Sequence, residues 1–418
     1  MGSLVKTFIM ESGERYCLLV DQCNGLPLFY PSLYVTTQVR NSSLSYSSME
    51  SALNGISVLL RFMEERGDNI EERFRVGDFL KIHELDTLRD FCQIKFKSSS
   101  VAAASDNGMF TLFELREHDE KVSSQTEYIR LTVIANYTKW LAKYISNNDK
   151  VKTPRILEME EALQARRPVR KGRNTGLKEK GLDEDQISLV FELFRPESEF
   201  NPFKEKSVRI RNRLIFLMLY HLGIRGGELL NIRIRDIDFE LNQLVVARRA
   251  DEIDDPRAKQ PLVKTLDRRI PMKEILANEI HKYILNVRKK IPNSNKNDYL
   301  FVTHKSGPTQ GLPLSISGYK KVINVVRKAS PDLYNLTGHA LRHTWNYNFS
   351  KRMDNMDNPP SYEVQEKIRS YSMGWRAGSG TGAEYNQRAI KEKANEVALE
   401  LQEGMICLPK GINNEQES

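Results

Sequence analysis

The segment Gly338-His339-Ala340-Leu341-Arg342-His343-Thr344 is the most informative stretch of the sequence. Gly338 allows a helix to begin abruptly, and on that helix His339 and Arg342 share one face because they are three residues apart. A histidine and an arginine that point the same way can bind one phosphate and provide one path for proton transfer. His339 and His343 also resemble a metal-binding pair, but the glutamate of HExxH is missing and no third ligand is evident. We therefore favour a packing role for His343.

A second motif, Gly223-Ile224-Arg225-Gly226-Gly227-Glu228-Leu229-Leu230, lies upstream. Gly223 is suited to end one helix, and Glu228 is suited to the first turn of the next. Arg225 then falls in the turn between them, close to a helix N-terminus. A permanently charged guanidinium at that place can bind a phosphate through several donors. Taken alone, the motif would favour an ordinary surface arginine.

Two further features complete the set. Lys259 and Lys264 belong to an expected β-hairpin, and Lys264 stands in the run Val263-Lys264-Thr265-Leu266-Asp267-Arg268-Arg269-Ile270-Pro271. Downstream, Met373-Gly374-Trp375 is followed by a glycine-rich stretch and then Tyr385. That stretch would let Tyr385 move into and out of a site. A lone tyrosine is usually a core residue, so Tyr385 gains significance only together with the other motifs.

The order of these motifs resembles the tyrosine recombinase (phage integrase) family. The box around Arg225 resembles the family's G-[LI]-R-x-x-E-L, and His339–Thr344 (HALRHT) resembles its second box. Lys264 resembles the hairpin lysine of K-T-x-x-R-x-[IV]-P, with Lys259 as a competing candidate. Trp375 stands where many members have a histidine, and the resemblance implies that its indole N–H donates to a phosphate. The resemblance covers roughly residues 181–400.

The resemblance implies a site-specific DNA recombinase or integrase that cuts and rejoins strands through a covalent 3′-phosphotyrosine. Such an enzyme would serve the integration, excision or transposition of a mobile genetic element. The open alternatives are a type IB topoisomerase-like enzyme, a telomere-resolvase-like enzyme and a catalytically silent DNA-binding member of the fold. The complete set of Arg225, Lys264, His339, Arg342 and Tyr385 argues against a silent protein.

The resemblance also implies a role for each of these side chains. Tyr385 would be the nucleophile. Arg225 and Arg342 would bind the non-bridging phosphate oxygens, whose charge grows in the transition state. His339 would accept or relay the tyrosine proton, and Lys264 would protonate the leaving 5′-oxygen. Because the two arginines and the lysine supply the positive charge, we expect neither a metal nor a cofactor, and religation would need no ATP.

The chain of 418 residues is long enough for two or three domains. We expect a mainly α fold with a small antiparallel β-sheet (α+β), in which a helical core-binding domain precedes a tyrosine-recombinase catalytic domain. The expected divisions are an N-terminal arm or small β-rich region of unknown role at 1–45, a helical DNA clamp at 46–150, a basic linker at 151–180, the catalytic domain at 181–403 and a tail at 404–418.

Residue periodicity predicts individual elements. Strand patterns cover Tyr16–Val20, Leu33–Val39, Gln243–Arg248, Pro261–Thr265 and Arg268–Pro271. Helical patterns include Val76–Lys95, Gln125–Tyr144, Glu184–Phe194, Ser207–Leu222, Gly338–Arg352, Tyr362–Met373 and Ala383–Gln402.

The net charge of +8, from 63 basic and 55 acidic residues, permits a polyanionic partner without requiring one. Cations cluster in the expected linker, which is either a solvated tether or a strap along a DNA backbone. The candidates for DNA contact are Arg166, Arg167, Arg170, Lys171, Arg173, Lys178 and Lys180.

No apolar stretch is long enough to span a bilayer, the N-terminus lacks a signal-peptide core, and the 4 cysteines are scattered. We therefore expect a reducing cytoplasm, with nucleoid association in a bacterial host. An apolar stripe from Ile390 to Leu401 either packs inward or, as the resemblance implies, belongs to a C-terminal segment that docks on a neighbouring subunit. The expected assembly is a homo-tetramer on double-stranded DNA, with accessory DNA-bending or directionality proteins as further partners.

Overall fold

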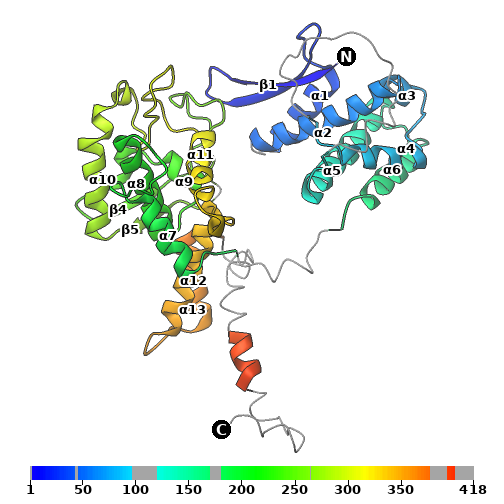
Figure 1. Ribbon diagram of the computed structural model, residues 1–418. Coiled ribbons are helices and arrows are strands. Elements are labelled where there is room, and N and C mark those ends of the chain that lie inside the picture. Colours follow the sequence, from blue (N-terminus) through cyan, green and yellow to red (C-terminus); the bar gives the residue numbers. More distant parts are fainter. Residues whose placement is uncertain are drawn as a thin grey trace, which may run out of the picture. The chain divides into compact units, whose positions relative to one another are not determined.

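The computed structural model describes residues 2–42, 46–96, 120–169, 180–263, 265–376 and 393–400. The chain divides into two compact units, Met1–Gly172 and Arg173–Ser418, and each is described by itself (Figure 1). Among the described residues, no helix combines the length and the apolar character that crossing a membrane requires.

The first unit packs a β-hairpin against a group of helices. Strands β1 (Ser3–Ile9) and β2 (Arg15–Asp21) pair antiparallel. The helices are α1 (Phe29–Tyr34), α2 (Tyr46–Glu65), α3 (Ile70–Arg75), α4 (Ile82–Cys92), α5 (Ser124–Ile145) and α6 (Thr153–Ala165), with a π-helical segment at Val35–Arg40. Leu53, Ile56 and Leu59 recur at helical spacing and are fully buried, so one face of α2 forms the core, where it contacts α5.

Helix α6 lies where the sequence pattern predicts the start of a linker. Ile156, Met159 and Leu163 recur at helical spacing and are buried, and α6 contacts α5. The proline at the start of α6 is compatible with a helix, because the N–H groups of the first turn have no acceptor within the helix in any case. Residues 153–165 therefore belong to the packed first unit and do not form a tether.

Two other predicted elements of this unit are wrong. The segment Leu33–Val39, expected as a strand, is helical, because Tyr34, Val35 and Val39 are buried on one helical side. The helix expected over Val76–Lys95 starts only at the beginning of α4. Gly77, at φ 77°, adopts the left-handed conformation that separates α3 from α4.

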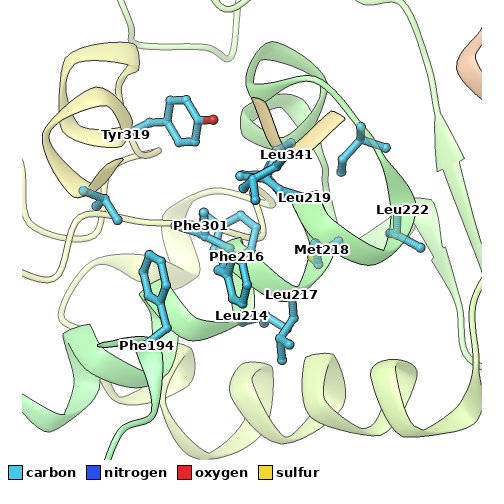
Figure 2. Packing of buried hydrophobic residues seen from close by; sticks show 14 of the residues in the cluster. Phe194, Leu214, Phe216, Leu217, Met218, Leu219, Leu222, Phe301, Tyr319 and Leu341 are labelled. Carbon is cyan, nitrogen blue, oxygen red and sulfur yellow. The ribbon is translucent and has the colours of Figure 1, made fainter. Parts of the chain in front are cut away.

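Helix α8 (Lys206–Leu222) runs through the core of the second unit (Figure 2). Phe216 stacks on Phe194 of α7 (Glu184–Phe194), with ring centroids 5.0 Å apart. Figure 2 also shows Leu219 of α8 beside Leu341 of α12 (Gly338–Asp354), and the two helices are in contact. Because Arg342 follows Leu341 directly, this packing fixes the helix that carries it.

A small antiparallel sheet in the order β3-β4-β5 follows α9 (Gly226–Asn231). Its strands are β3 (Ile237–Asp238), β4 (Gln243–Val246) and β5 (Arg268–Pro271), and β4 pairs with β5 from Gln243↔Pro271 to Val246↔Arg268. The strand expected at Pro261–Thr265 is absent from the described residues of that segment. Asn231 donates to the carbonyl of Pro261, so this stretch is bonded to α9 instead of to a neighbouring strand.

The second unit also contains the α-helices α10 (Glu274–Asn286), α11 (Ile316–Arg327) and α13 (Tyr362–Met373). Residues 393–400, inside the expected helix Ala383–Gln402, are helical, and the rest of that segment lies outside the described residues. The fold is mainly helical with small antiparallel sheets, as the sequence predicts.

Candidate active site

Arg225 occupies the turn between α8 and α9. Gly223 ends α8 in the left-handed conformation, at φ 61°. Arg225 is then extended and precedes the first residue of α9, and its backbone N–H donates to Oε2 of Glu228 at 3.1 Å. Its Nη1 lies 3.6 Å from Oε1 of Glu228, too far for a direct hydrogen bond. The side chain is 24% exposed, so the guanidinium borders the surface beside a helix N-terminus.

Arg342 is fully buried and is held by the ends of two helices. Its Nη1 donates to the carbonyl of Gly223 at 2.7 Å, and its Nη2 donates to the carbonyl of Met373 at 2.9 Å. The guanidinium carbon also lies 5.6 Å from the ring centroid of Trp375. Trp375 is buried against Met373, with Trp345 packed on the pair. The structure therefore brings together three motifs that are far apart in the sequence.

Glu228 is the acidic centre of this cluster. Its Oε2 accepts from Arg268 Nη2 at 2.8 Å, and its Oε1 accepts from the Thr265 hydroxyl at 2.6 Å. Burial by itself would raise the pKa of the Glu228 carboxyl, but Arg268 outweighs it, aided by Arg342 and Thr265, so the pKa lies below its ordinary value. Glu228 is thus a buried carboxylate that bonds to the Arg268 guanidinium, to the Thr265 hydroxyl and to the backbone of Arg225.

The two hairpin lysines have different surroundings. Lys264 lies outside the described residues, but its neighbours Val263 and Thr265 are buried, and Thr265 bonds to Glu228. Lys259 is exposed and lines a surface cavity at the start of α11, together with Thr303 and Lys320. The chain directly after Lys264 is therefore bonded to Glu228, whereas Lys259 faces the cavity at α11.

His339 is the second residue of α12, next to a close contact between elements. Thr337 caps the helix by accepting from the N–H of Ala340 at 2.9 Å, and His339 is exposed in the first turn. A Cβ added at Gly338 would lie 2.0 Å from the Tyr319 hydroxyl, and one at Gly226 would lie 2.6 Å from the same ring. The Tyr319 ring therefore separates the N-termini of α9 and α12. His343, one turn further along, is half-buried.

Of the predicted linker cations that are described, Arg166 and Arg167 contact other residues of the first unit. Arg166 Nε donates to Asp86 at 2.7 Å. Arg167 donates to Gln164 and lies over the ring of Tyr128, with its guanidinium carbon 5.1 Å from the centroid. Lys180 is exposed. Outside the described residues lie Arg170, Lys171, Arg173, Lys178, the predicted nucleophile Tyr385 and the tail.

Sequence reasoning missed the part played by Arg268, Thr265 and Tyr319. Arg268 and Thr265 are fixed letters of the K-T-x-x-R-x-[IV]-P pattern, so the pattern was the available signal. For Tyr319 we find no sequence signal, because its contacts depend on how α11 packs. Among the described residues, no three His, Cys, Asp or Glu side chains are grouped so that they could hold a metal ion.

Sequence comparisons with known proteins match part of the chain to one family. Residues 181–360 match the profile of the phage integrase family. The tyrosine recombinase XerC of Staphylococcus epidermidis is 31% identical over 137 residues, which are 32% of this chain and 39% of that protein. XerD of Halalkalibacterium halodurans is 25% identical over 136 residues, again 32% of this chain and 39% of the relative. The chain therefore aligns with about two fifths of the length of these relatives.

Solved structures give a weaker likeness. The Tn1549 transposon integrase in complex with circular intermediate DNA is 16% identical, with 85% of this chain and 94% of that chain covered and a TM-score of 0.48. The XerH recombinase bound to its difH substrate is 18% identical, with 66% of this chain and 72% of that chain covered and a TM-score of 0.38. These values are too low to assign roles to single residues.

Residues 181–360 thus match the phage integrase family, and the XerC relative to which they are similar is a tyrosine recombinase. The matched range contains Arg225, Lys264, His339 and Arg342. Trp375 and Tyr385 lie beyond its C-terminal limit, so their roles depend on the motif order and on the contacts of Trp375.

Proposed function

We propose that the chain is a site-specific DNA recombinase or integrase that breaks and rejoins DNA through a covalent 3′-phosphotyrosine, in the integration or excision of a mobile element. The observation that carries the proposal is that Glu228 bonds to the backbone of Arg225 and to Thr265 of the hairpin, while Arg342 bonds to Gly223, two residues before Arg225. Fixed cations in one small region suit a phosphodiester whose charge increases during the reaction.

The proposed chemistry assigns one task to each group. The Tyr385 oxygen attacks phosphorus, the bond from phosphorus to the 5′-oxygen breaks, and the 3′-phosphate becomes attached to the tyrosine. His339 accepts the tyrosine proton, and Lys264 gives a proton to the leaving 5′-oxygen. Arg225 and Arg342 bind the non-bridging oxygens. Attack by a 5′-hydroxyl on the phosphotyrosine reverses the step and reseals the strand without ATP.

The proposal also concerns the rest of the chain. The first unit would act as the core-binding clamp, and the cations from Arg166 to Lys180 would follow the DNA backbone as the duplex is enclosed. The active assembly would be a tetramer on two duplexes, with residues 404–418 docked on a neighbouring subunit. Deletion of 404–418 should reduce tetramer formation on DNA, as measured by sedimentation. An unchanged tetramer would refute the docking role of the tail.

The test is a nicked suicide substrate, whose short 5′ fragment diffuses away after cleavage and so traps the covalent intermediate. Duplexes bound by the Tyr385→Phe variant, selected from a random pool, supply the sequence for the substrate. We expect the wild type to form an adduct that survives denaturant. The Tyr385→Phe variant should bind the same DNA and form none.

Tyr371→Phe is the matched control, because Tyr371 is 66% exposed in the same part of the chain. It should form the adduct at the wild-type rate. An adduct that persists in Tyr385→Phe would show that another residue attacks. DNA binding without any wild-type adduct would support the silent DNA-binding alternative. Relaxation of supercoils without exchange between two sites would support the topoisomerase-like one.

A further inference from the structure

Arg268 is a buried arginine whose three guanidinium nitrogens contact three different parts of the site. Nε donates to the carbonyl of Ser372 at 2.8 Å, Nη1 to the Thr265 hydroxyl at 3.2 Å, and Nη2 to Oε2 of Glu228 at 2.8 Å. Its side chain is 1% exposed. Arg268 therefore connects the end of α13, the returning arm of the hairpin and the carboxylate behind Arg225.

The hairpin is attached to the end of α13 a second time. The N–H of Leu266 donates to the carbonyl of Gly374 at 2.9 Å. Gly374 has φ 66°, and a Cβ there would lie 2.7 Å from Nη1 of Arg268 and 2.9 Å from the carbonyl oxygen of Leu266. The close approach of these two segments requires a glycine. Residues 265–268 are thus fixed at several points, directly after the position of Lys264.

Fixing this arm matters if the hairpin presents a proton donor. An alkoxide leaving group is strongly basic, and a proton donor helps only when it lies within hydrogen-bond reach of the departing oxygen. A displacement of about 1 Å in such a group can cost about 10²-fold in rate. We propose that Arg268 is a positioning residue, which holds the hairpin so that its lysine reaches the leaving 5′-oxygen. This inference rests on the proposed function.

A purely structural role for Arg268 makes a different prediction. If Arg268 only stabilised the fold, its replacement would slow cleavage of every substrate alike. If it acts through the proton donor, the defect should disappear with a leaving group that needs no proton. A substrate with sulfur in place of the bridging 5′-oxygen provides such a group, because a thiolate leaves without protonation.

The experiment measures single-turnover cleavage of the oxygen and sulfur suicide substrates by the full chain. In Arg268→Lys, the single ammonium cannot bond to all three acceptors in the geometry of the guanidinium. We expect cleavage of the oxygen substrate to slow by about 10²-fold and cleavage of the sulfur substrate to stay within about threefold of wild type. Lys264→Ala should give the same pattern with a larger defect on oxygen.

Two further variants separate positioning from folding. Thr265→Val keeps Arg268 but removes the hydroxyl between Arg268 and Glu228, so it should give a smaller defect with the same rescue by sulfur. Arg288→Lys is the matched control, because Arg288 is 5% exposed and donates to the carbonyls of Tyr299, Ser294 and Asn297 away from the site. It should lower the melting temperature and change both cleavage rates equally, if at all.

Equal defects of Arg268→Lys on both substrates, or no defect on either, would overturn the inference. The inference would also fail if Thr265→Val slowed both substrates alike in a protein that melts like wild type. A wild-type chain that binds DNA but cleaves neither substrate would overturn the proposed function itself, and the inference with it. The wild-type reaction therefore distinguishes the two failures.

Discussion

The carboxylate of Glu228 should be a costly single charge to remove from the second unit. Glu228→Gln keeps the size of the side chain but deletes the charge that faces Arg268, at 2.8 Å, and that accepts from the backbone of Arg225. Both Glu228 and Arg268 have side chains that are 1% exposed or less. Removal of one partner of a buried ion pair costs about 3–5 kcal/mol, because the other charge stays buried. Since glutamine retains one acceptor oxygen, we expect Glu228→Gln to lower the free energy of unfolding by about 3 kcal/mol.

This magnitude can be measured by thermal and urea unfolding of the full chain. For a unit of this size each kcal/mol lowers Tm by about 2–4 °C, so the second unit should melt about 6–12 °C earlier. Glu279→Gln is the control, because Glu279 pairs with Arg213 at 2.5 Å but the two side chains are 30% and 37% exposed. It should cost about 1 kcal/mol or less.

The loss of stability caused by Glu228→Gln should also depend on pH. The folded-state pKa of Glu228 is lowered, so its contribution to stability is present at neutral pH and is lost as the pH falls below the ordinary value of 4.5. The difference between wild type and Glu228→Gln should therefore shrink in acid. A Glu228→Gln variant as stable as Glu279→Gln at pH 7 would refute the view that Glu228 holds the site together.

Other perturbations test separate parts of the structure. In the first unit, Glu84 accepts from Arg73 at 2.7 Å and its pKa is lowered to about 2, so Glu84→Gln should destabilise that unit by about 3 kcal/mol in urea unfolding. Gly338→Ala should lower the cleavage rate more than DNA affinity, because the new methyl group would collide with the Tyr319 hydroxyl. Equal losses in the kinetic and binding assays would contradict this prediction. Burial, with help from Arg211, lowers the pKa of His304 to about 3, so its neutral form stabilises the fold above pH 6.5 and this contribution is lost as the pH falls towards 3. Urea unfolding should show a loss of about 2 kcal/mol between pH 7 and pH 5 that His304→Gln abolishes.

The sequence predicted helices well where apolar residues recur over several turns. The predicted helix Glu184–Phe194 has the observed bounds of α7, and Gln125–Tyr144 matches α5 to within a residue at each end. The prediction of a strand at Leu33–Val39 is wrong, because the β-branched and aromatic residues there suggest a strand but their burial follows a helical face. Basic residues at the end of α6 are typical of a linker, but the apolar residues within that helix recur at helical spacing and are buried.

The sequence names Arg225, His339 and Arg342 as candidates because each lies in a motif of a few consecutive residues. What spacing cannot show is which distant carbonyl a buried arginine meets, and the contacts of Arg342 with Gly223 and Met373 arise only from the packing of α8, α12 and α13. The same holds for Arg268, whose three acceptors come from three elements.

The most direct test of the proposed chemistry is to identify the residue that carries the DNA. The adduct trapped on a suicide substrate can be digested with protease and nuclease and sequenced by mass spectrometry. We predict a nucleotide 3′-phosphate linked to the phenolic oxygen of Tyr385, and a free 5′-hydroxyl on the released strand. A nucleotide attached to any other residue, or a 5′-phosphate linkage, would contradict the proposed mechanism.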